Sequence, residues 1–350
     1  MSPRLRVLVV VAVCVIAAAG AAVAVAFNGR GPGGQAEGPR EGNPPLALDV
    51  ALDDPRTARA LVEAERLYND GRLEDARIAF DAILVRQPDL LEARVGDAVA
   101  RWPAGTVARL RGLLDTSPES ALVRLHLGLA LFWERQDGQA VESWQAALEV
   151  EPDSPAALRA ENLLHPDMPL FRPIFVPDLD LPAEAQGKPL GEQLGILERR
   201  ATASDSADDW LIYGTALQRA SRPISAEEAF GRAVGADPAR VDAQVARIVA
   251  QFTKDDPSAS FSQLGPLAGQ HPDEPVIRYH LGLMLLWLRQ VTQAETELEQ
   301  ARDAAPGTFY AQQAQTLLDR LRQVAAGADT GPADTGEEPA ATPGADTSAG

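Results

Sequence analysis

The sequence of 350 residues contains a single cysteine, Cys14, and only four histidines. One cysteine excludes an internal disulfide, a zinc site built on cysteines and a redox pair of thiols. With so few soft ligands we expect no metal site, and we expect no cofactor either. The sequence also lacks a glycine-rich phosphate loop, a His-Glu-x-x-His motif and a Gly-x-Ser-x-Gly motif. We therefore assign no catalytic residue and expect a protein that is not an enzyme.

Basic residues are also scarce, with 32 Lys+Arg against 50 Asp+Glu and a formal net charge of −18. This charge opposes binding to a phosphate backbone, so we expect no nucleic acid partner. Lysine occurs only at Lys188 and Lys254, and the remaining basic residues are arginines, which is typical of a bacterial protein encoded by a GC-rich genome. Aromatic residues make up 5%, and the frequent alanines favour closely packed helices.

One long hydrophobic run occurs, over residues 7–26, and it has neither a charge nor a proline. Twenty helical residues span about 30 Å, the thickness of the hydrocarbon core. Because Arg4 and Arg6 precede the run directly, we expect a transmembrane anchor with a cytoplasmic N-terminus. The alternative is a signal peptide cleaved after Ala26. In both cases a flexible tether over residues 27–46 follows, and the rest of the chain is exported.

Prolines recur after predicted helices, most often 34 residues apart. They are Pro88, Pro118, Pro152, Pro238, Pro272 and Pro306. Within one 34-residue window, 121–154, small and large residues follow a fixed order of Leu127, Gly128, Leu131, Ala140, Trp144, Ala147 and Pro152. Three other windows repeat this order, and two more, 91–118 and 239–272, repeat it in degenerate form. The period and pattern resemble those of the tetratricopeptide repeat family.

The second half of the sequence restates the first at offsets of 150 and 154 residues. The resemblance therefore implies an all-α, right-handed helical solenoid in two duplicated lobes, 47–165 and 190–325, each closed by an extra helix (154–164 and 308–321). The segment 166–189 between them, here the inter-lobe strap, is rich in proline but too apolar for a free linker. We expect it to lie on a lobe. Residues 326–350 are expected to form a disordered acidic tail.

The tetratricopeptide resemblance implies that the first helix of each repeat lines a concave face, and in two repeats these positions are apolar. They are Leu122, Leu125, Leu129, Phe132 and Trp133 in the third repeat and Val276, Tyr279, Leu283, Leu286 and Trp287 in the sixth. We expect them to form a groove for a helix or an extended peptide. The alternative is that the closing helix, the strap or the other lobe fills the groove. His126 and His280, at equivalent positions, are expected to pack in the interior.

These observations predict a non-catalytic scaffold for protein interactions, held in the cytoplasmic membrane by residues 7–26 with its lobes on the extracytoplasmic side. Its partner is expected to be a protein or peptide of the cell envelope. In layout it resembles anchored tetratricopeptide subunits that assist secretion, cytochrome maturation or envelope assembly, and this likeness does not select among those roles. The alternatives are a secreted soluble binding protein and an accessory to an envelope enzyme.

Overall fold

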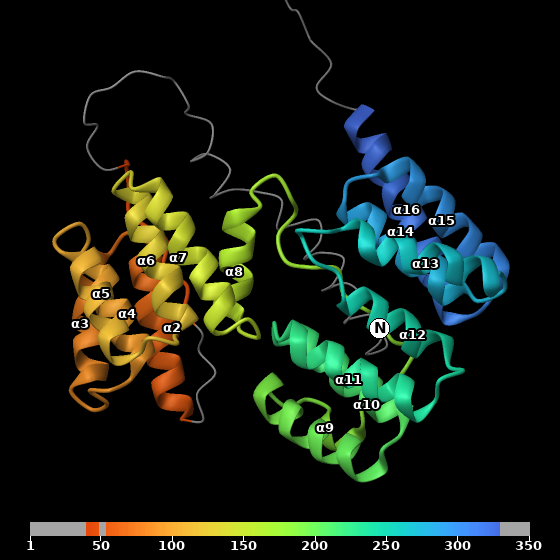
Figure 1. Ribbon diagram of the computed structural model, residues 1–350, viewed down its shortest axis with the longest axis horizontal. Coiled ribbons are helices and arrows are strands. Elements are labelled where there is room, and N and C mark those ends of the chain that lie inside the picture. The colour runs from red at the N-terminus through yellow and green to blue at the C-terminus, as the bar shows by residue number, and fades with distance from the viewer. Residues whose placement is uncertain (1–39, 49–53, 330–350) are drawn as a thin grey trace, which may run out of the picture.

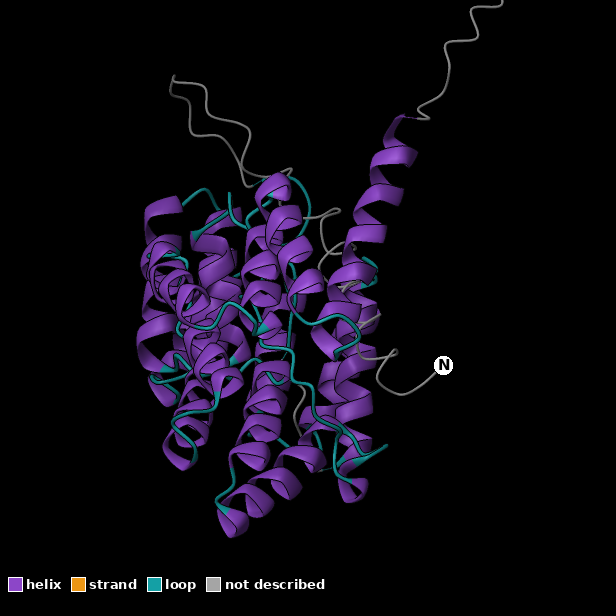
Figure 2. Ribbon diagram, turned by 90° about the vertical axis from the view of Figure 1, so that its right-hand side faces the viewer, coloured by secondary structure: helices purple, strands orange, loops and turns teal. Residues whose placement is uncertain are grey.

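The computed structural model describes residues 40–48 and 54–329. In this part of the chain it has fifteen α-helices, one short 3-10 helix and no β-strand (Figure 2). Lobe 1 comprises α2 (Pro55–Asn69), α3 (Leu73–Leu84), α4 (Leu91–Ala100), α5 (Thr106–Thr116), α6 (Ala121–Trp133), α7 (Asp137–Val150) and α8 (Pro155–Leu164). Lobe 2 comprises α9 (Leu190–Ser204), α10 (Ala207–Arg219), α11 (Pro223–Ala236), α12 (Val241–Ala250), α13 (Ser258–Gln270), α14 (Pro275–Trp287), α15 (Val291–Ala304) and α16 (Phe309–Asp329). The strap follows α8 and leads to α9 (Figure 1), and its 3-10 helix η1 (Ala183–Ala185) packs on α9.

Side-chain caps begin several of these helices where the sequence places Ser or Asp. The Ser120 hydroxyl accepts a hydrogen bond from the N–H of Val123 at the start of α6. The Asp54 carboxylate accepts two such bonds at the start of α2, where its pKa is lowered by the hydrogen bonds that it receives from Thr57 and the backbone. These caps satisfy backbone donors that have no partner within the helix. Each of the six spaced prolines lies in the loop that follows a second helix, as the sequence predicts.

Glycines in the first helices allow the two helices of a repeat to touch. A Cβ on Gly128 would lie 2.3 Å from the indole Nε1 of Trp144, on α7. On Gly282 it would lie 2.7 Å from Cγ of Leu298, on α15. Since real Cβ atoms do not approach so closely, only glycine fits at these positions. The small and large residues of the repeat pattern therefore meet as the sequence predicts.

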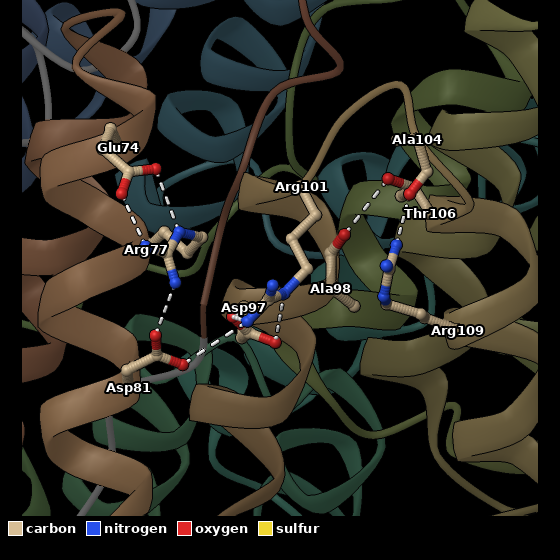
Figure 3. Close-up of polar contacts among 9 residues, drawn as sticks. All are labelled: Glu74, Arg77, Asp81, Asp97, Ala98, Arg101, Ala104, Thr106 and Arg109. Atoms are coloured by element: carbon tan, nitrogen blue, oxygen red, sulfur yellow. Dashed lines mark hydrogen bonds and ion pairs between the residues drawn. The ribbon is translucent and has the colours of Figure 1, made fainter.

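The degenerate second repeat is held by polar contacts as well as by packing. Figure 3 shows ion pairs that connect α3 with the end of α4. Arg77 and Asp81 of α3 are 2.7 Å apart, Arg101 lies 2.8 Å from Asp97, and Arg101 lies 3.5 Å from Asp81. The buried Thr106 hydroxyl donates to the carbonyl of Ala98, at 3.1 Å, and so connects α5 to α4.

The first helices of successive repeats pack against one another, and each row ends on the closing helix of its lobe. The row is α2, α4, α6 and α8 in lobe 1, and α10, α12, α14 and α16 in lobe 2. We refer to the surface that each row forms as the first-helix face. Helix α9, which packs on α10, has no counterpart in lobe 1 and was not predicted.

Two predicted boundaries differ from the structure. The tether expected over residues 27–46 is wrong for residues 40–46, because Arg40 and Leu46 bond to lobe 1 and Leu46 is buried in its core. The tail expected over residues 326–350 is wrong for residues 326–329, because α16 continues to Asp329. The remainder of both segments, and residues 7–26, lie outside the described part of the chain. Among the described helices, none is both long and apolar enough to cross a bilayer.

Candidate functional site

An extended segment of the chain itself lies on the first-helix face of each lobe. In lobe 1 it is segment 40–48, and in lobe 2 it is the part of the strap around Phe175 and Val176. Leu46 and Leu48 belong to the hydrophobic core of lobe 1, and Phe175 and Val176 belong to that of lobe 2. The strap thus lies on a lobe, as the sequence predicts.

A buried histidine binds the backbone of each segment. The N–H of Ala47 donates to Nε2 of His126 at 3.2 Å, and the N–H of Val176 donates to Nε2 of His280 at 3.0 Å. Burial lowers the pKa of both histidines to about 4, so both are neutral at pH 7. The predicted interior packing of the two rings is confirmed, and sequence reasoning missed that each accepts a backbone hydrogen bond.

The closing helix binds the carbonyl of the same residue in each lobe. The Arg159 side chain, on α8, donates to the carbonyl of Ala47 at 3.2 Å. The Tyr310 hydroxyl, on α16, donates to the carbonyl of Val176 at 3.1 Å. Burial raises the pKa of Tyr310 well above its ordinary value, which keeps this hydroxyl protonated as a donor. Both polar groups of Ala47 and of Val176 are therefore bound by side chains of the lobe.

The preceding residue of each segment is held by an amide side chain of the first helix in the row. In lobe 1 the Asn69 amide accepts from the N–H of Leu46 at 3.3 Å and donates to its carbonyl at 3.0 Å. In lobe 2 Oε1 of Gln218 accepts from the N–H of Phe175 at 3.0 Å. The two lobes therefore bind an extended backbone in the same register, through an amide, a histidine and a donor on the closing helix.

The ten residues predicted for the groove lie on α6 and α14, and most of them are buried. Trp133, Leu283 and Leu286 are half-buried. The other seven, Leu122, Leu125, Leu129, Phe132, Val276, Tyr279 and Trp287, are buried. Arg40 lies over the Phe132 ring at 3.6 Å from its centroid, and Phe175 stacks on His280 at 4.8 Å. The strap was one of the occupants of the groove considered from the sequence, and it is the one seen in lobe 2. Segment 40–48, which is seen in lobe 1, was not considered.

Polar contacts between the lobes flank the strap. Arg172 forms two hydrogen bonds, of 2.8 and 3.0 Å, with the buried carboxylate of Glu161 on α8. The buried ammonium of Lys254, from the loop before α13, donates to the Asn162 side chain and to the carbonyl of Pro169. Burial lowers the pKa of Lys254 to about 8. In the part of the chain that the structure describes, no group of three or more His, Cys, Asp or Glu side chains could hold a metal ion.

No protein-family model matches the chain, and no curated protein matches it. Solved structures of tetratricopeptide repeat proteins do match. YrrB, described as a TPR protein with an unusual peptide-binding site, aligns over 59% of this chain and 97% of its own at 18% identity and a TM-score of 0.28. Yeast Tom70 aligns over 80% and 70% at 13% identity and a TM-score of 0.27. A C-terminal part of a TPR protein from Cytophaga hutchinsonii aligns over 73% and 98% at 11% identity and a TM-score of 0.25.

The TM-scores of these alignments are low, so the assignment rests on contacts within this chain. Three repeats place a glycine of the first helix against a large residue of the second, at Gly128, Gly214 and Gly282. A Cβ on Gly214 would lie 2.5 Å from the Phe230 ring. The chain is built from tetratricopeptide-type repeats. The resemblance inferred from the sequence is thereby confirmed at the level of the fold.

Proposed function

We propose that this protein is a scaffold that binds extended segments of protein partners on the first-helix face of its lobes. The observation that supports it is the repeated mode of backbone binding, in which Ala47 and Val176 each donate to a buried histidine and accept from the closing helix. Main-chain hydrogen bonds give affinity for an extended peptide of varied sequence, and neighbouring apolar contacts give selectivity. No catalytic step is needed for this role.

Site-specific photocrosslinking in intact cells tests this function. A benzoylphenylalanine residue in place of Asp137, whose side chain is 60% exposed at the edge of the lobe 1 face, should crosslink to a discrete protein partner. The same residue in place of Val85, which is 85% exposed directly after the end of α3, is the matched control and should give no such product. Equal crosslinking from both positions, or none from either, would contradict a partner on the first-helix face.

We propose further that residues 7–26 anchor the protein in the cytoplasmic membrane, with the N-terminus in the cytoplasm and the lobes on the extracytoplasmic side. The support is in the sequence, where twenty uncharged residues follow Arg4 and Arg6. Protease added to spheroplasts should digest the lobes, and complete protection would exclude this orientation. A mature N-terminus at Phe27 would instead indicate a secreted soluble binding protein.

A further inference from the structure

The two internal segments are fixed to their lobes to different degrees. The strap in lobe 2 is held at its flank by the buried Glu161 carboxylate, which binds Arg172, and by Lys254, which binds the carbonyl of Pro169. The first contact joins the strap to lobe 1 and the second joins it to lobe 2, and Lys254 also donates to Asn162 of lobe 1, so the strap is part of the junction between the lobes. Segment 40–48, in contrast, forms its hydrogen bonds with side chains and backbone groups of lobe 1.

The flank of segment 40–48 is held at the water-exposed edge of lobe 1. The Arg40 guanidinium binds the Asp137 carboxylate through two hydrogen bonds, of 3.0 and 3.1 Å, and also binds the carbonyl of Phe132. The Asp137 side chain is 60% exposed. An ion pair in such a place contributes little to stability, because water and salt screen it. It does select an arginine, whose planar group matches a carboxylate and an aromatic face together.

The lobe 2 face lacks this arginine site. At the offset of 154 residues the position of Asp137 is taken by Val291, and that of Phe132 is taken by Leu286. Because Val291 and Leu286 replace the carboxylate and the aromatic ring, the lobe 2 face can form neither the ion pair nor the ring contact with a guanidinium. The arginine site therefore belongs to lobe 1 alone.

The buried part of segment 40–48 defines the rest of the chemistry. Leu46 and Leu48 are 2% and 4% exposed, and Ala47 between them makes the two backbone hydrogen bonds described above. The Tyr68 hydroxyl donates to the carbonyl of Pro44 at 2.7 Å. The face thus binds an arginine, a proline four residues later, and leucines six and eight residues later. Ordering nine residues costs conformational entropy, which opposes the gain from burying two leucines and forming the hydrogen bonds, so the segment is held less firmly than its contacts alone would suggest.

We propose that segment 40–48 is an exchangeable internal ligand of lobe 1, and that it is displaced by a partner segment of the same chemistry, an arginine followed by a proline-containing run with two leucines. This inference rests on the proposed function and adds its regulation. A tethered segment competes at an effective concentration of roughly millimolar, so a partner must bind more tightly than segment 40–48 or be held nearby. The lobe 2 strap, fixed in the junction, does not exchange.

A fluorescent peptide with the sequence of residues 40–48 tests this proposal on the full chain in detergent. In Leu46→Asp the internal segment carries a charge that the apolar face rejects, whereas the face itself is unchanged. We expect this variant to bind the peptide at least about tenfold more tightly than the unmodified protein, as measured by fluorescence anisotropy. Arg40→Ala, which removes the contacts with Asp137 and with the ring and carbonyl of Phe132 but leaves the two leucines in place, should give a smaller gain in the same direction. If Leu46→Asp loses its helical circular dichroism, the effect of Arg40→Ala on peptide affinity tests the proposal instead.

Phe175→Asp is the matched control, because Phe175 takes the place of Leu46 in the lobe 2 segment and its change should not increase peptide binding. The proposal is overturned if the unmodified protein binds the peptide as tightly as the variants do. In that case the face is open to ligands and the proposed function stands. If folded variants and the unmodified protein all fail to bind the peptide, the proposal and peptide binding on this face both fail.

Discussion

The backbone N–H of Val176 donates a 3.0 Å hydrogen bond to Nε2 of His280 inside lobe 2. The other ring nitrogen, Nδ1, lies 2.7 Å from the carbonyl of Val276 one helical turn earlier, so Nδ1 carries the proton and Nε2 accepts. His126 has the same two contacts, with Leu122 and Ala47, in lobe 1. A neutral ring in one tautomer is therefore required in both lobes.

Acid should weaken this arrangement before it protonates most carboxylates. Burial lowers the pKa of His126 and of His280 to about 4, below the ordinary 6.5, so the unfolded chain binds more protons between those values. The free energy of unfolding should thus be highest above pH 6.5 and fall as the pH drops towards 4, by up to about 3 kcal/mol for each histidine. Urea unfolding at several pH values measures this slope.

The matched variant for this prediction is His126→Gln, whose amide oxygen can accept the Ala47 N–H without titrating. It should remove one histidine's share of the slope between pH 6.5 and 4. The Arg159 cation contributes to the low pKa of His126, and Asp242 acts in the opposite direction on His280. Slopes that are identical in the variant and the unmodified protein would show that His126 does not titrate with folding.

Gly128→Ala should destabilise lobe 1 by roughly 1 to 3 kcal/mol, because the new methyl group must displace the Trp144 indole. That indole donates to the carbonyl of Leu125 at 3.3 Å, so its displacement also disturbs a hydrogen bond. Gly138→Ala is the control, since a Cβ there meets no atom within 4 Å on the exposed side of α7. Thermal unfolding should show a lower Tm for the first variant and an equal or higher Tm for the second. Equal Tm values would contradict the close contact.

The repeats could be predicted from the sequence because their determinants are local. Gly128 and Trp144 lie in one repeat, and the prolines follow their helices directly, so a fixed spacing reveals both the helices and their contacts. Helix α9 was missed because it has no equivalent in lobe 1, and a search for repetition cannot find what occurs once.

The occupants of the first-helix faces were harder to predict, because an apolar face does not indicate which segment covers it. A signal was present, since Pro44, Leu46 and Ala47 correspond in binding register to Pro173, Phe175 and Val176. The spacing between these segments is shorter than the repeat offset of 150 residues, because η1 and α9 lie between Val176 and α10 but have no counterpart in lobe 1. A comparison at the repeat offset therefore does not align them.

Trp133 and Trp287 occupy equivalent positions but should respond differently to truncation. Trp287 is 6% exposed and packs edge to face against Phe252 at 5.0 Å, so Trp287→Ala should destabilise lobe 2 by about 3 to 5 kcal/mol. Trp133 is half-buried beside Phe132, so its truncation should cost less. For Trp133 we keep the prediction made from the sequence. Its truncation should reduce the capture of a partner more than it reduces the free energy of unfolding. Thermal unfolding and crosslinking yield on both variants separate the two effects, and equal losses of Tm would contradict the difference.

Lys254, one of the two lysines in the chain, makes one of the contacts in the junction between the lobes. Lys254→Met keeps the length of the side chain but removes the donor to Asn162 and to the Pro169 carbonyl, so that these half-buried acceptors lose a partner. The neighbouring Phe171 is 50% exposed, and its N–H is held by the same Asn162 side chain at 3.0 Å. We therefore expect chymotrypsin to cleave the strap after Phe171 several times faster in this variant.

Lys188→Met serves as the control for this experiment, because Lys188 is exposed and pairs only with Glu192 on α9 among the contacts in the described part of the chain. Surface pairs of this kind contribute little, so its cleavage rate should match that of the unmodified protein. If Lys254→Met is also cleaved at that rate, the strap is held without the buried ammonium, and Arg172 with Glu161 would be the contact that fixes it. A faster rate in Lys254→Met alone shows that the ammonium joins the closing helix of lobe 1, the strap and lobe 2.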